Sequence, residues 1–219
     1  MKKFFKYLFF PNRNKQRIFS GPSKGMYVKY DVNHRFQHLL GLYEREIYPY
    51  LKKGIKKSEV LIDIGANDGY YVLAFLRSGK KIIACEPGPI VDELINNSKL
   101  NDYSESPGFI IERRMVGPAL SVGFVSVEQL VKDSEGTNFF LVDIDGGEFD
   151  LLCSCGNDFD HGSSKWLIET HSKELEKKCI NFLLKRKYNI TIIKNAWWRK
   201  FIPEQRPLVH NRWLYAEPV

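Results

Sequence analysis

VLIDIGANDGYY, at residues 60–71, is the stretch of sequence that decides the fold. It opens with an apolar run that ends at Ile64, as in a strand buried on both faces of a parallel sheet. Gly65 and Gly69 then make a turn, and the residues that follow predict a helix over residues 69–78. Strand, glycine turn and helix in this order are typical of an open α/β sheet, in which ligands bind beyond the carboxyl ends of the strands.

Strands and helices alternate along the rest of the chain. Besides the strand at residues 60–64, the apolar pattern predicts buried strands at residues 81–85, 109–111, 139–144 and 166–170. Apolar residues at helical spacing predict helices at residues 35–53, 89–101, 127–132 and 173–187. This alternation favours a right-handed, mostly parallel, doubly wound α/β sheet.

Several features complete the outline of the fold. The last two predicted strands, at residues 190–193 and 213–216, have no helical pattern between them, which indicates a C-terminal antiparallel hairpin. Pro49 is expected to kink or end the helix at residues 35–53. No linker separates two hydrophobic cores, so residues 21–219 are predicted to form one domain behind a basic and aromatic tail at residues 1–20.

The glycine turn suits a cofactor that contains a nucleoside. Glycine lets the backbone approach a ligand closely, and the start of the following helix offers free N–H groups. A phosphate-binding P-loop needs Gly-Lys-Ser/Thr, which is missing here, and the dinucleotide fingerprint needs a glycine where Asn67 stands. The acid Asp63 precedes the turn, in an acid-x-Gly-x-x-x-Gly pattern. That acid suits S-adenosylmethionine, whose ammonium and sulfonium groups are cationic.

A second acid ends the next predicted strand, KIIACEP at residues 81–87. An acid about twenty residues after a glycine turn accepts hydrogen bonds from ribose hydroxyls. NAD-binding proteins share this feature, so Glu86 indicates a nucleoside without choosing which one. The predicted cofactor-binding residues are Asp63, Gly65, Ala66, Asn67, Gly69, Tyr70, Glu86 and Asp143.

With these motifs the sequence resembles the FkbM family of methyltransferases. LIDIGANDGYY corresponds to the family's D-x-G-A-N-x-G-x-Y loop, and ACEPGP to its E-P pair after the second strand. The family's K-x-D-V-E-G-x-E segment corresponds to FFLVDIDGGEFDLL at residues 139–152, and its E-V-H-like strand end to residues 168–171. The resemblance runs from about Tyr43 to the C-terminus. Leu141 stands in place of the family's Lys and Asp145 in place of its first Glu, which affects the acceptor more than the cofactor.

This resemblance implies a class I methyltransferase with a Rossmann-like, mostly parallel, seven-stranded sheet. It also implies transfer of a methyl group, typically to a hydroxyl oxygen on a sugar or natural product. The expected acceptor is therefore a glycan or small molecule. Two alternatives stay open: an RNA methyltransferase, and a catalytically inactive methyltransferase fold that serves as an interaction module. The inactive fold predicts a degraded cofactor loop, whereas Asp63, Gly65, Gly69 and Glu86 are all present.

Ionisable residues gather at or just beyond the ends of two later strands: Asp143, Asp145, Glu148, Glu169 and His171. An alcohol is a very weak acid, so its methylation needs a base or a metal ion. In one interpretation Asp143, Glu169 and His171 hold a divalent cation such as Mg²⁺. In the other, His171 or Asp145 acts as general base, with Asp143 as the third candidate catalytic residue. The plainest alternative is a turn in which Glu148 caps the next helix.

The net charge of +7 lies almost wholly in the tail. The first twenty residues hold six Lys and Arg and no acid, and the rest of the chain holds 27 basic and 26 acidic residues. A near-neutral body lacks the positive field that nucleic acid binding uses, so RNA is not the expected partner.

Residues 1–17 have aromatic residues on one helical face and lysines towards the other. This pattern predicts a cytoplasmic protein whose tail contacts the anionic inner face of the membrane. The alternative is a tail whose aromatic residues pack on its own domain. Cys85 and Cys179 lie in apolar stretches and are expected in the core of a reduced protein.

Overall fold

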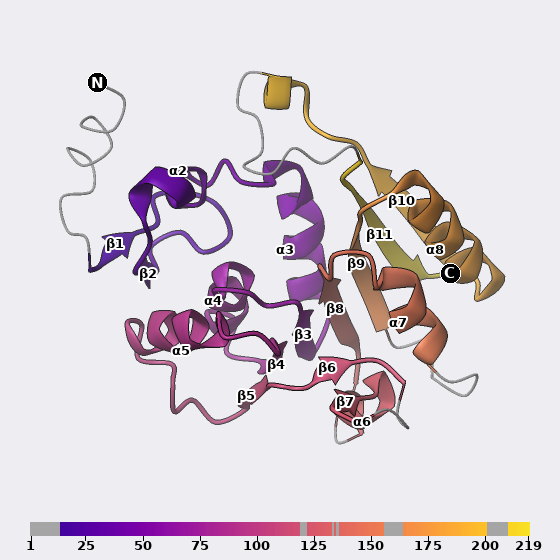
Figure 1. Ribbon diagram of the computed structural model, residues 1–219, viewed down its shortest axis with the longest axis horizontal. Helices are drawn as coiled ribbons and strands as arrows, with labels where there is room; N and C mark the ends of the chain where they lie inside the picture. The colour runs from indigo at the N-terminus through magenta and orange to yellow at the C-terminus, as the bar shows by residue number, and fades with distance from the viewer. Residues whose placement is uncertain (1–13, 119–121, 133, 135, 156–163, 201–209) are drawn as a thin grey trace.

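A mixed sheet of seven strands, counted over the residues that the structure describes, forms the centre of the protein (Figure 1). The computed structural model describes residues 14–118, 122–132, 134, 136–155, 164–200 and 210–219. The strand order is β10-β11-β9-β8-β3-β4-β5. The strands are β3 (Val60–Ile64), β4 (Lys81–Cys85), β5 (Phe109–Glu112), β8 (Asn138–Val142), β9 (Ser164–Thr170), β10 (Tyr188–Ile193) and β11 (Arg212–Pro218).

Strand pairing confirms the predicted fold class. β3 is parallel to β4 and β8, β5 is parallel to β4, and β9 is parallel to β8. β11 is antiparallel to both of its neighbours, β9 and β10. The sheet is therefore Rossmann-like, doubly wound and mostly parallel, and it ends in the predicted C-terminal antiparallel hairpin.

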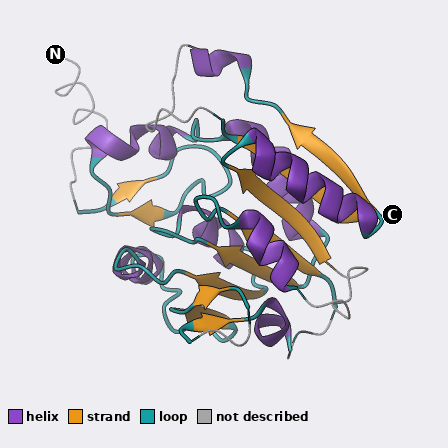
Figure 2. Ribbon diagram, turned by 45° about the vertical axis from the view of Figure 1, so that its right-hand side comes forward, coloured by secondary structure: helices purple, strands orange, loops and turns teal. Residues whose placement is uncertain are grey.

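Helices cover both faces of the sheet (Figure 2). Successive strand residues alternate between two hydrophobic clusters, because Leu61 and Phe139 belong to one cluster and Ile62 and Phe140 to the other. The first cluster lies under α2 (Val32–Leu40), α3 (Tyr48–Lys56), α4 (Tyr70–Leu76) and α5 (Val91–Lys99). The second lies under α6 (Val127–Val131), α7 (Glu148–Ser154) and α8 (Lys173–Lys185), and it includes the buried Cys85 and Cys179.

The prediction of one helix at residues 35–53 is wrong. The chain forms α2, then the short 3₁₀ helix η1 (Arg45–Ile47), then α3. The break occurs at Gly41, whose left-handed backbone (φ 65°) ends α2 and whose added Cβ would lie 2.4 Å from the carbonyl carbon of Ser20. Pro49 stands in the first turn of α3, where proline is favoured, so it neither kinks nor ends a helix. Apolar residues continue at helical spacing across the break, which hides it in the sequence.

Smaller elements also differ from the predictions. β8 ends at Val142, so Ile144 lies beyond the strand, and the connection before β11 contains a 3₁₀ helix, η3 (Trp197–Lys200). Two small sheets were not predicted: β1 (Gln16–Arg17) with β2 (Tyr27–Val28), and β6 (Met115–Val116) with β7 (Phe124–Val125).

The predicted tail lies largely outside the described residues, which begin at residue 14. Within its last part, Gln16 and Ile18 are buried and β1 pairs with β2. The domain boundary and the membrane contact of residues 1–17 stay predictions. Over the described ranges, we find no helix with the length and apolar character needed to cross a membrane.

Register brings four strand ends together at one edge of the sheet. Ile64 of β3 pairs with Cys85 of β4 and with Val142 of β8, and Val142 pairs with Ile168 of β9. The residues that follow these four are Gly65, Glu86, Asp143 and Glu169. The topology therefore places the predicted cofactor loop beside the predicted acids.

The close packing of α3 on β8 can be tested by a substitution in α3. A Cβ added at Gly54, in the buried face of α3, would lie 2.4 Å from the Phe139 ring. Although alanine favours a helix more than glycine does, we expect Gly54→Ala to lower the free energy of unfolding by about 1–3 kcal/mol, because the ring must move. Denaturant unfolding measures this. Combining Gly54→Ala with Phe139→Leu should cost less than the sum of the two single changes, and strict additivity would contradict the packing account.

Candidate active site

Two cavities adjoin at the carboxyl ends of the central strands. Their volumes are about 640 Å³ and about 400 Å³, and we call them the larger and the smaller cavity. Both are lined by Gly65, Asn67, Asp143 and Asp145. The two cavities therefore share a wall that includes the glycine loop.

The glycine loop is clamped between two strand ends. The N–H groups of Gly65 and Ala66 both donate to the carbonyl oxygen of Cys85, at 2.9 and 3.1 Å. On its other side Gly65 has φ 88°, and an added Cβ would lie 1.9 Å from the carbonyl oxygen of Asp143. Only glycine can occupy this position without moving β8 away. Gly69, also with positive φ, lines neither cavity and instead begins α4 against Leu94.

Glu86 is held in place by backbone donors. The Asn67 N–H donates to its Oε2 at 2.9 Å and the Gly88 N–H donates to its Oε1 at 2.7 Å. Asn67 reaches this position with a left-handed backbone (φ 50°), which asparagine tolerates. Each carboxylate oxygen has a second lone pair, and Glu86 lines the larger cavity. The carboxylate is thus oriented to accept hydrogen bonds from two neighbouring hydroxyl groups.

Asp63 is a buried acid on the smaller cavity. Its side chain is 2 % exposed, and Oδ2 has no hydrogen-bond partner among the described residues. Burial raises the pKa of Asp63 well above its usual value, and the nearby Asp143 and Glu86 raise it further. A buried polar atom without a partner is costly, so this geometry fits a ligand that brings a cationic donor to Asp63. The predicted cofactor has such a donor in its ammonium group.

His171 lies at the centre of a group of carboxylates. Its Nδ1 bonds Oε1 of Glu148, a fully buried residue. Its Nε2 lies 3.3 Å from Asp145 Oδ1, 3.5 Å from Glu169 Oε2 and 3.7 Å from Asp143 Oδ1. Burial opposes the charged ring, but Glu148 and Glu169 outweigh burial and raise the pKa of His171 to about 10. At neutral pH the ring is therefore a cation in this arrangement.

Glu148 does not cap α7, the role that was the plainest alternative from the sequence. It is the first residue of α7, and it makes no side-chain bond that caps this helix. Its Oε1 accepts the Gly146 N–H at 3.0 Å in addition to bonding His171. Glu148 thus fixes the imidazole orientation and the turn between β8 and α7.

The structure brings together part of the predicted metal set. One ligand atom from each of Asp143, Asp145 and His171 lies within 4.8 Å of the others. Asp145 thus stands where Glu169 was predicted. Burial and the neighbouring Glu44 raise the pKa of Glu169, which disfavours the charged form of this carboxyl. A protonated carboxyl is a poor ligand for a hard cation.

Several residues that line or border the smaller cavity were not predicted as site residues, and among them Arg35, His38, Tyr43 and Glu44 lie in the segment before β3. The His38 ring stacks on Tyr43 with 3.9 Å between ring centres. Burial, with a contribution from Arg35, lowers the pKa of His38 to about 3, so its ring is neutral. Arg35, His38 and Tyr43 line the smaller cavity together with Tyr70. No motif marks these residues, because they reach the site only through the break at Gly41.

Solved structures with a similar fold include methyltransferases. A SAM-dependent O-methyltransferase from Thermotoga maritima matches with a TM-score of 0.54 and 11 % identity, over 88 % of this chain and 73 % of that chain. A methyltransferase from Escherichia coli matches with a TM-score of 0.51 and 12 % identity, over 94 % and 99 % of the two chains. An rRNA methylase from Streptococcus thermophilus matches with a TM-score of 0.50 and 10 % identity, over 81 % and 98 %.

At these identities the likenesses show the fold alone, and the chain shares the Rossmann-like fold of these methyltransferases. No family model matches the sequence, and no curated protein matches it. The resemblance to the FkbM family therefore stays a prediction.

The buried carboxyl of Glu44 is expected to make the stability of the protein depend on pH. Its backbone is left-handed (φ 44°), its side chain is buried, and Tyr71 Oη donates to its Oε2 at 2.6 Å. Burial, together with Asp143, raises the pKa of Glu44 to about 7. The folded protein therefore holds a proton that the unfolded chain loses at lower pH. The contribution of this proton to the free energy of unfolding is fully present below the pKa of Glu44 in the unfolded chain. It is lost as the pH rises through about 7.

Glu44→Gln removes this proton equilibrium and keeps an oxygen acceptor for Tyr71. From pH 5 to pH 8.5 we expect the variant to gain up to about 3 kcal/mol relative to the natural protein. Thermal unfolding at both pH values measures the gain. The exposed Glu105→Gln is the matched control. An equal difference between variant and natural protein at both pH values would contradict this account of Glu44.

Proposed function

We propose that this protein transfers a methyl group from S-adenosylmethionine to a hydroxyl oxygen of a sugar, glycan or related small molecule. The observation that carries the proposal is the placement of two acids in adjoining cavities, Glu86 in the larger cavity and Asp63 in the smaller one. One carboxylate is oriented for a diol and the other is buried without a partner on Oδ2 among the described residues. A nucleoside joined to an amino-acid ammonium group satisfies both.

The larger cavity fits the nucleoside half of the cofactor. Glu86 would accept the ribose hydroxyls, and apolar walls would bury the base, at Ile90, Val116, Phe124 and Leu151. In the smaller cavity, Asp63 would bind the ammonium group. When bound, the cofactor supplies a methyl group made electrophilic by the sulfonium charge. Gly65 and Asn67, which line both cavities, would hold the cofactor at the wall that the cavities share.

The acceptor would occupy the rest of the smaller cavity. Its walls include the stacked rings of His38 and Tyr43, and the carboxyl groups of Asp143, Asp145 and Glu169. Aromatic faces pack against the apolar face of a sugar ring, and carboxyl groups bond its hydroxyls. The same carboxylates repel a phosphate backbone, which argues against the RNA alternative.

Deprotonation of the acceptor is assigned to Asp145. The protonated His171 ring lies 3.3 Å from Asp145 Oδ1 and partly neutralises the surrounding carboxylates. A general base at His171 would need the neutral ring, which the carboxylates disfavour. The second possibility is a divalent cation held by Asp143, Asp145 and His171, which would bind the acceptor oxygen and make its proton more acidic.

Cofactor binding tests the proposal directly. Calorimetry should give micromolar binding of S-adenosylmethionine to the natural protein, or about −8 kcal/mol. Glu86→Ala should weaken binding about tenfold or more, because two hydrogen bonds to a charged acceptor are lost. The exposed Glu105→Ala is the control. A folded natural protein that gives neither heat nor a thermal shift with the cofactor would refute the enzyme assignment and favour the inactive interaction module.

The role of Asp145 is tested after an acceptor is found by screening sugars and small hydroxyl compounds. We expect Asp145→Asn to lower kcat about 10²-fold or more, with a much smaller change in cofactor affinity. Assays with EDTA and with added Mg²⁺ separate direct base catalysis from catalysis through a cation. Unchanged kcat in the variant under both conditions would remove Asp145 from the chemistry.

A further inference from the structure

The smaller cavity has one cationic wall. Among its described lining residues, Arg35 is the sole Lys or Arg, and it faces a set of acids, Asp63, Asp68, Asp143, Asp145 and Glu169. The guanidinium group comes from α2, more than twenty-five positions before the glycine loop in the chain. Its side chain is 29 % exposed, so it is half-buried and still accessible from the cavity.

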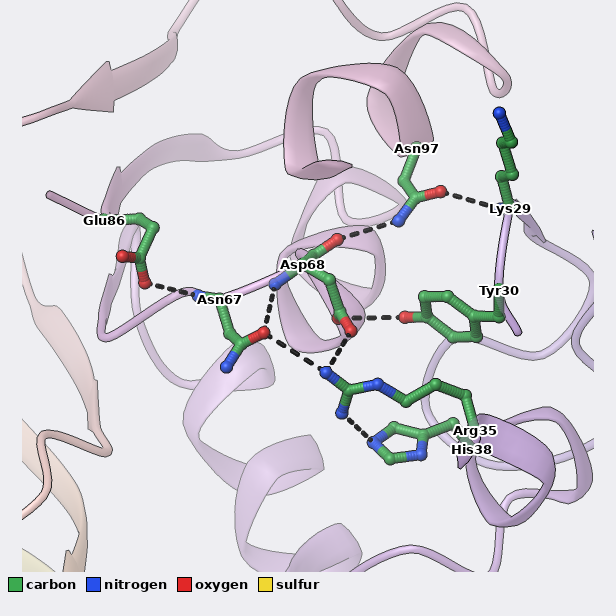
Figure 3. A network of polar contacts seen from close by, with 8 residues as sticks. All are labelled: Lys29, Tyr30, Arg35, His38, Asn67, Asp68, Glu86 and Asn97. Atoms are coloured by element: carbon green, nitrogen blue, oxygen red, sulfur yellow. Dashed lines mark hydrogen bonds and ion pairs between the residues drawn. The ribbon is translucent and has the colours of Figure 1, made fainter. Parts of the chain in front are cut away.

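Arg35 is aimed at the glycine loop by a break in its own helix. Its backbone (φ −110°, ψ 20°) is non-helical inside α2. From there Nη2 lies 2.8 Å from Asp68 Oδ2 and 3.4 Å from Asn67 Oδ1, and Nη1 lies 3.3 Å from His38 Nε2 (Figure 3). The side chain is therefore fixed beside the loop that borders both cavities.

Its main partner, Asp68, is itself held firmly. Tyr30 Oη donates to Asp68 Oδ1 at 3.0 Å, and Asn97 Nδ2 donates to the Asp68 carbonyl oxygen at 2.9 Å (Figure 3). The contacts of Arg35 with Asp68, Asn67 and His38 involve its Nη1 and Nη2 atoms. Its Nε has no acceptor among the described residues, and a guanidinium group has five N–H donors in all. Arg35 can thus bind a further anion without leaving Asp68.

The cofactor proposed above ends in an amino acid that carries one ammonium and one carboxylate. Asp63 accounts for the ammonium, but the other acids of the smaller cavity would repel the carboxylate. We propose that Arg35 binds this carboxylate and so makes α2 part of the cofactor site. This inference rests on the proposed function. It also makes Arg35 the residue by which the protein distinguishes S-adenosylmethionine from cofactors that lack the carboxylate.

The test compares two ligands in binding experiments that need no acceptor. Decarboxylated S-adenosylmethionine keeps the nucleoside, the sulfonium and the ammonium and lacks only the carboxylate. Calorimetry should show the natural protein binding S-adenosylmethionine about tenfold or more tightly than the decarboxylated form. In Arg35→Gln this preference should fall to near unity through loss of affinity for S-adenosylmethionine alone. Arg35→Lys should keep part of it, and Arg77→Gln, which removes an exposed cation elsewhere, should keep all of it.

Other outcomes of these binding experiments separate the inference from the proposed function. Equal affinity of the natural protein for both ligands overturns the inference and leaves the proposed function standing. Equal loss of both ligands in a folded Arg35→Gln variant also overturns it, because Arg35 would then only shape the loop. A natural protein that binds neither ligand refutes the proposed function, and the inference with it. Should Arg35→Gln fail to fold, the preference of the natural protein and of Arg35→Lys still decides the matter.

Discussion

The contact between Gly65 and the carbonyl oxygen of Asp143 is the constraint on which the site depends. There is no room for a side chain, since an added Cβ would lie 1.9 Å from that oxygen. Two strand ends, β3 and β8, can therefore meet closely enough for the loop of one and the acids of the other to border the same cavities. The bonds from Gly65 and Ala66 to Cys85 fix the loop to β4 in the same way. The site is thus determined by backbone contacts of the central sheet.

The second feature of the site is a concentration of acids that the fold only partly neutralises. Asp63, Glu44 and Glu169 are buried, and burial raises the pKa of each. His171 and Arg35 supply positive charge at the two ends of the cluster. Such an arrangement stabilises a cationic ligand at the expense of the unliganded protein. Burial of these acids thus reduces the stability of the folded chain when no such ligand is bound.

Patterns that are local in the sequence predicted most of the fold. The strands were recognisable because buried parallel strands are short apolar runs. Glu86 and Asp143 directly follow two of these strands, and Glu169 lies near the end of a third. Residues before β3 were missed for a physical reason. Helical spacing continues past Gly41, and nothing in the sequence reveals that Arg35 leaves the helical conformation or that Glu44 adopts a left-handed one. The pKa of His171 was equally inaccessible, since it depends on Glu148 reaching back from α7.

The segment before α2 depends on residues that come much later in the chain. The Tyr27 and Lys29 N–H groups donate to Asn101 and Asn97 of the α5 region, 74 and 68 positions further on. During synthesis this segment leaves the ribosome well before its partners exist. It must stay undocked until α5 has emerged, and closing so long a loop carries an entropic cost. The contacts of this segment with Asn97 and Asn101 can thus form only after the central strand and its glycine turn have been synthesised.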